Sequence, residues 1–114
     1  MPGDHYALLH HAVTELLLFR HPEERELIQG ELVAARASMD GLEPSGNLDS
    51  QPWRRMLQSR IDNNAGYHYR LRYELFDAAE AYRRALTYGN GSGSDLAFAQ
   101  LRGEILNNLA FAYS

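Results

Sequence analysis

The chain has 114 residues and a mass of 13.0 kDa, which suits one small domain. Its 45% apolar and 23% charged residues argue against disorder, and its net charge of −4 argues against general nucleic-acid binding, which needs a basic surface. Without cysteine, disulfides and thiol chemistry are excluded. Apolar runs such as 16–19 are far shorter than the ~20 residues of a membrane span. We therefore expect a cytoplasmic protein with no membrane partner.

The first 40 residues predict a hairpin of two helices. Asp4 is a suitable cap for a helix that continues to Arg20, and the residue before Pro22 is pushed out of helical geometry. Pro22 then suits the first turn of a second helix, which Gly41 ends. The apolar face of the first helix is predicted to hold Tyr6, Leu9, Val13, Leu16, Leu17 and Phe19, and that of the second Leu27, Ile28, Leu32, Ala35 and Met39.

The rest of the chain predicts three more helices and no strand. Residues 41–51 are rich in turn formers, and Asp49 or Ser50 can cap a helix that runs from Pro52 to about Tyr73. After a tight turn near 73–74, a fourth helix is predicted over 75–88, followed by a loop at 89–94. Asp95 caps a fifth helix that reaches nearly to the end of the sequence.

An internal repeat gives a further signal. Residues 61–69 match residues 105–113 at an offset of 44, with the isoleucine, both asparagines and the last tyrosine identical. Gly66 corresponds to Ala110, and a short side chain at this place lets a neighbouring helix approach closely.

These residues resemble a tetratricopeptide repeat. The family places a small residue and an aromatic in the first helix, then Ala, aromatic and Ala in the second, and this order is matched by Gly66, Tyr69, Ala78, Tyr82 and Ala85. Departures from the family pattern are Asp62 for a tryptophan, Tyr73 for the turn glycine, and Asn90 for the terminal proline.

The resemblance implies an all-α fold, a right-handed array of helical hairpins (an α-α superhelix) with about five helices. We expect one domain over 1–114. Within it, 5–40 is a degenerate repeat or a capping hairpin, 52–90 is a repeat, and 95–114 is the first helix of a following repeat.

The resemblance also implies a concave groove, lined by the first helices of successive repeats, that binds a peptide or a partner helix. The residues carried over to this groove are Arg60, Asn63, Asn64, Tyr67, Arg70 and Leu71, then Glu104, Asn107, Asn108 and Phe111. Asparagine both donates to and accepts from a peptide backbone, and arginine holds a carboxylate with two hydrogen bonds. The alternative is that the asparagines only satisfy neighbouring helices or solvent.

We therefore expect a protein–protein interaction module, a fragment of a larger scaffold or regulatory protein. The alternative is a structural module that self-associates, because the last helix presents an apolar face without a partner helix, formed by Leu106, Leu109 and Tyr113. Nucleic-acid binding through the arginine-rich helix is a weaker alternative, since the chain is acidic overall.

No motif indicates catalysis or a cofactor. His11 and Glu15 lie one turn apart, but no third metal ligand follows at motif spacing. The sequence has neither a nucleophile elbow nor a phosphate-binding loop. The glycine-rich segment 89–94 is not such a loop, because it lacks the lysine that a phosphate-binding loop requires. We expect a protein without catalytic residues, metal or cofactor.

Overall fold

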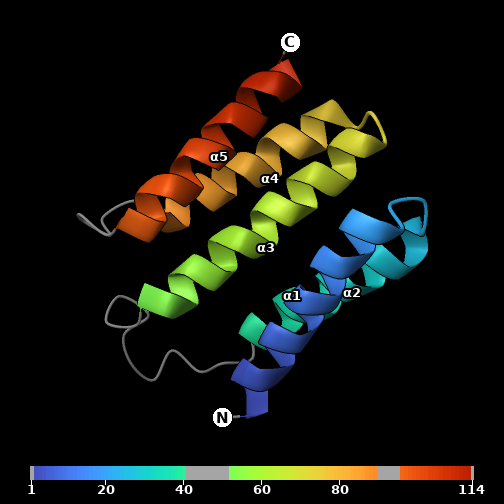
Figure 1. Cartoon of the computed structure of the whole chain (residues 1–114), viewed down its shortest axis with the longest axis vertical. Helices are drawn as coiled ribbons and strands as arrows, with labels where there is room; N and C mark the ends of the chain where they lie inside the picture. The colour runs from blue at the N-terminus through green and yellow to red at the C-terminus, as the bar shows by residue number, and fades with distance from the viewer. Residues whose placement is uncertain (1, 41–51, 90–95, 114) are drawn as a thin grey trace. The chain divides into compact units, whose positions relative to one another are not determined.

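The computed structural model describes residues 2–40, 52–89 and 96–113, and these residues form an all-α structure (Figure 1). The helices are α1 (Pro2–Arg20), α2 (Arg25–Asp40), α3 (Pro52–Leu71), α4 (Leu75–Gly89) and α5 (Leu96–Tyr113). The prediction of five helices is confirmed, and no strand occurs in these three ranges. The predicted loops at 41–51 and 89–94 lie outside the described residues, apart from Gly89, as do the caps at Asp49, Ser50 and Asp95.

The chain divides into two compact units, Met1–Asn47 with α1 and α2, and Leu48–Ser114 with α3, α4 and α5. The assignment of these helices to repeats within one domain stays a prediction.

In the first unit α1 packs against α2, as the sequence predicts. The two helices are joined by the side chain of His10, whose Nδ1 donates a hydrogen bond to Glu31 Oε1 at 2.6 Å. The predicted apolar face of α1 is wrong: Tyr6, Leu9, Leu16 and Phe19 are exposed. The buried face of α1 instead consists of Ala7, His11, Thr14 and Leu18.

The second helix begins later than predicted. Pro22 lies in a turn, where the Glu24 amide donates to the His21 carbonyl at 3.0 Å. The Glu24 carbonyl then accepts from the Ile28 amide at 3.0 Å, so Glu24 is the residue that opens the hydrogen-bond ladder of α2. Its carboxylate carries a negative charge at the positive end of the helix dipole.

In the second unit α4 packs against both α3 and α5, and α3 and α5 also touch (Figure 1). Ala78, Tyr82 and Ala85 of α4 are fully buried in a core that they share with residues of α5. A Cβ atom on Gly66 of α3 would lie only 2.4 Å from Cε1 of Tyr82. Glycine at this position therefore lets the backbone of α3 lie directly on the tyrosine ring.

Polar side chains also join α3 to α4. The buried Ser59 hydroxyl donates to the Ala85 carbonyl at 2.8 Å. Asp62, which stands where the resembled family has tryptophan, is fully buried, with Oδ1 3.5 Å from Nε of Arg84. The tryptophan position is thus filled here by one partner of an ion pair between the two helices.

A tight turn connects α3 to α4, as the sequence predicts. The Glu74 amide donates to the Tyr69 carbonyl at 2.9 Å and the Tyr73 amide to the Arg70 carbonyl at 3.0 Å, the pattern of a Schellman motif. Tyr73 is the left-handed residue of this motif, with φ of 60°. A tyrosine thus holds a left-handed conformation of the kind that usually favours glycine.

Candidate functional site

The centre of the candidate site is the guanidinium of Arg70, which lies between two aromatic rings. Its Cζ is 4.8 Å from the centroid of the Tyr67 ring and 4.5 Å from that of the Phe111 ring. Tyr67 and Arg70 are neighbours on the surface of α3 because they are three residues apart, whereas Phe111 comes from α5. Attraction between the cation and the two rings therefore links the helices through the Arg70 side chain.

Arg70 keeps its hydrogen-bonding capacity. No carboxylate or hydrogen-bond acceptor in the described part of the chain contacts its guanidinium, although the side chain is half-buried. Other arginines nearby are paired: Arg72 lies 3.2 Å from Glu74, and Arg84 pairs with Asp62. Arg70 thus presents a positive charge whose N–H donors remain available to a ligand.

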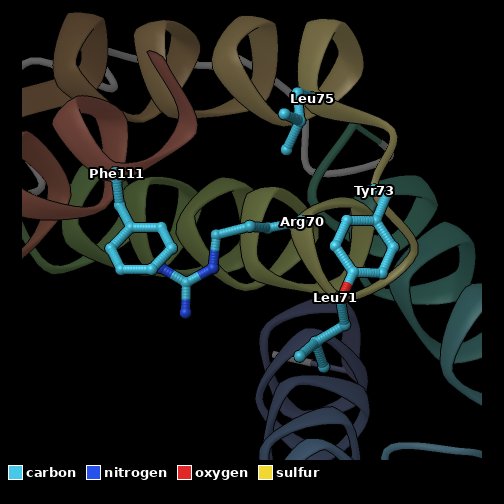
Figure 2. Close-up of a pocket in the computed structure, with 5 residues that line it drawn as sticks. All are labelled: Arg70, Leu71, Tyr73, Leu75 and Phe111. Atoms are coloured by element: carbon cyan, nitrogen blue, oxygen red, sulfur yellow. The ribbon is translucent and has the colours of Figure 1, made fainter. Parts of the chain in front are cut away.

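A hollow of about 410 Å³ lies beside this arginine (Figure 2). The close-up shows the Arg70 side chain extending from α3 toward the Phe111 ring, with Leu75 at the start of α4. The lining consists of Arg70, Leu71, Tyr73, Leu75 and Phe111. The hollow therefore combines one cation with mainly apolar and aromatic walls.

Sequence reasoning located Arg70, Leu71 and Phe111 but missed Tyr73 and Leu75. Tyr73 reaches the hollow because the left-handed turn redirects the chain between α3 and α4. Its signal in the sequence is the replacement of the expected turn glycine by a tyrosine. Leu75 is the first residue of the helix predicted over 75–88, and it is 40% exposed.

The asparagines predicted for the groove divide into two groups. Asn108 Nδ2 donates to Asn63 Oδ1 at 3.1 Å, which joins α5 to α3 beside the arginine stack. This contact agrees with the alternative that these amides satisfy a neighbouring helix, although each keeps further donors or acceptors. Asn64 is half-buried and Asn107 is exposed.

The remaining predicted contact residue, Arg60, is half-buried on α3. Two groups of predicted residues connect α3 with α5. The first is the cluster of Tyr67, Arg70 and Phe111, and the second is the hydrogen-bonded pair of Asn63 and Asn108.

Tyr82 supports the site from beneath α3. Its hydroxyl is buried without a hydrogen-bond partner among the described residues. Burial raises the pKa of Tyr82 from 10.0 to about 12, and Tyr67 adds a smaller upward effect, while the positive charge of Arg70 acts in the opposite direction. The charge of Arg70 is therefore felt in the core as well as at the surface.

The three residues predicted for self-association lie in different surroundings. Leu106 is exposed, whereas Leu109 is partly buried against the core that contains Ala78 and Tyr82. The hydroxyl of Tyr113 accepts a hydrogen bond from Arg83, whose Cζ also lies 5.6 Å from the ring centroid. The side chains of Leu109 and Tyr113 are thus engaged within their own unit.

Histidines and carboxylates do not gather into a metal site in the described ranges, where no group of three or more such residues occurs. The predicted pair does form: His11 Nε2 lies 3.6 Å from Glu15 Oε2, with His11 buried. Within the same ranges, no helix combines the length and apolar character that crossing a bilayer requires.

Comparison of the chain with protein-family models, curated proteins and solved structures finds no match.

Proposed function

We propose that this chain is a protein-interaction module that binds an extended peptide across α3 and α5. The observation that carries the proposal is the hollow beside Arg70, together with the two contacts that align α3 with α5. The surface offers a cation with unused donors, aromatic faces and amide side chains, which are the groups that recognise both a peptide backbone and its side chains.

The proposal includes a right-handed array of the tetratricopeptide type and a cytoplasmic location. Supporting it, Gly66 and Tyr82, which take the family's small and aromatic positions, are in direct contact between α3 and α4. One side of α3 packs against α4, and another side faces solvent and α5. This second side suits a binding surface that is formed by the first helices of successive repeats.

The proposal is tested with peptides selected from a random library displayed against the whole chain. The double variant Asn64→Ala with Arg70→Ala is expected to weaken the selected peptides at least about tenfold, which is ~1.4 kcal/mol, by fluorescence anisotropy. The matched control is Arg102→Ala on α5. Nine residues separate position 102 from Phe111, which is about two and a half helical turns, so the two side chains lie on opposite sides of the helix. Equal affinity in the double variant with unchanged helicity, or no selected peptide at all, contradicts the proposal.

A second candidate function is self-assembly, favoured by the exposed apolar side chains of α1. Leu9 and Leu16 lie opposite the buried face of this helix, and Phe19 is 81% exposed. Light scattering coupled to size exclusion is expected to give a mass that rises with protein concentration, and Leu9→Gln with Leu16→Gln is expected to remove the rise. A constant monomer mass rules out this function.

A further inference from the structure

We propose that the hollow beside Arg70 selects peptides that carry an acidic side chain within two residues of a bulky apolar side chain. This inference rests on the proposed function and specifies its ligand. The acidic group is a side-chain carboxylate that pairs with Arg70, and the apolar group occupies the space between Leu71, Leu75, Tyr73 and Phe111.

The first step of the argument is the geometry of the cation. A guanidinium packed between two ring faces keeps its N–H donors at its edges, where a carboxylate can accept two parallel hydrogen bonds. The rings also restrict the rotamers of Arg70, so less conformational entropy is lost when a ligand binds. Arg70 is half-buried, and an ion pair there is screened less than at a fully exposed site.

The second step is the character of the walls. Two leucines and two aromatic rings line an open hollow of about 410 Å³, within the range of about 300–1,000 Å³ that is typical of ligand pockets. An apolar side chain that enters this space gains about 25 cal/mol for each Å² removed from water. A small or polar side chain would leave these walls in contact with solvent, so the hollow favours a large apolar residue.

The third step concerns the number of charges. Arg72, the next arginine along the chain, is neutralised by Glu74, and the whole sequence has a net charge of −4. Arg70 is the one charged residue among those that line the hollow, so the hollow matches one carboxylate, whereas a polyanion needs several cations. Because side chains two residues apart in an extended peptide lie on the same side, the acidic and apolar groups are expected at alternate positions.

The test uses a library of random 12-residue peptides that are fused at both ends to a display protein. The peptides then have no free C-terminal carboxylate, and every carboxylate that they offer belongs to a side chain. Selection on the wild-type chain is expected to enrich Asp or Glu within two residues of Leu, Ile, Met or Phe. Selection on Arg70→Gln is expected to lose the acidic preference and keep the apolar one, and Leu75→Ala is expected to do the reverse. Arg102→Gln, the matched loss of one charge on the far side of α5, is expected to select the same peptides as wild type.

A second measurement needs no change in the protein. Replacing the acidic residue of a selected peptide by its amide is expected to weaken binding to wild type about tenfold, and binding to Arg70→Gln less than about twofold. An equal loss in both proteins, or selection without an acidic preference, overturns the inference. If peptides bind and lose affinity in the Asn64→Ala, Arg70→Ala variant but show no such preference, this inference fails while the proposed function stands.

Discussion

Replacing Gly66 by alanine tests the close contact between α3 and α4. Added to an unobstructed helical position, a methyl group stabilises a protein by about 1 kcal/mol, because glycine is a poor helix former. At Gly66 the new Cβ would lie 2.4, 2.6 and 2.7 Å from three atoms of the Tyr82 ring, all well inside the 3.4 Å where ordinary contact begins. The ring is fully buried, so it cannot turn away from the new methyl group without displacing other core residues.

Overpacking of this kind costs about 3 kcal/mol at the upper end of its usual range. Subtracting the gain in helix propensity leaves an expected destabilisation of about 2 kcal/mol for Gly66→Ala. Urea unfolding followed by the fluorescence of Trp53, the one tryptophan of the sequence, measures this change in the unit that contains α3.

Two controls separate packing from helix propensity. A Cβ at Gly103 of α5 meets nothing within 4 Å, so Gly103→Ala is expected to stabilise the same unit by about 1 kcal/mol. In a Tyr82→Leu background, which lacks the outer ring atoms, the cost of Gly66→Ala is expected to fall by at least about 1 kcal/mol. Stabilisation by Gly66→Ala equal to that of Gly103→Ala refutes the reasoning.

Three further predictions address the turn, the buried hydroxyl and a helix–helix hydrogen bond. Tyr73→Gly is expected to stabilise the second unit by about 1 kcal/mol in urea unfolding, because φ of 60° strains tyrosine but not glycine. The control Tyr73→Ala keeps this backbone strain, so an equal gain in stability from Tyr73→Ala contradicts the explanation. Because the fold raises the pKa of Tyr82 from 10.0 to about 12, its contribution is complete below pH 10 and is lost as the pH rises toward 12, by about 1 kcal/mol at pH 11. Tyr82→Phe is expected to lessen this decline in urea unfolding at pH 9 and 11, and an unchanged decline contradicts the assignment. Ser59→Ala removes a buried bond to the Ala85 carbonyl and is expected to cost about 1 kcal/mol in the same assay; no loss contradicts its role in joining α3 to α4.

The helices were predictable because each carries a helical repeat of apolar residues and turn formers at its ends. In α4 the pattern also identified the buried face, since the apolar residues Ala78, Tyr82 and Ala85 recur at helical spacing and are fully buried. In α1 it failed, because apolar residues surround the helix and no single direction dominates. Its buried face carries small and polar residues, Ala7, His11 and Thr14, which hydropathy alone does not select.

The candidate site was predictable where residues follow the repeat. Tyr67, Arg70 and Phe111 lie at positions that the resemblance assigns to the groove, and they form one cluster. The sequence repeat aligns Asn64 with Asn108, yet Asn108 bonds to Asn63, because the packing of two helices decides which amides meet. Tyr73 was missed since its place depends on a backbone conformation that no spacing of residue types reveals.

The buried phenol of Tyr82 also gives the protein an internal reporter. The sequence has seven tyrosines, and Tyr73, with 87% of its surface exposed, reacts with iodinating or nitrating reagents without any change in structure. Tyr82 is expected to react only when the packing around α4 opens, because its ring lies against Gly66 of α3 in the core shared with α5 and its hydroxyl is enclosed. The ratio of labelling at these two rings therefore measures how often α4 separates from its neighbouring helices in the native protein, down to populations that spectroscopy does not register.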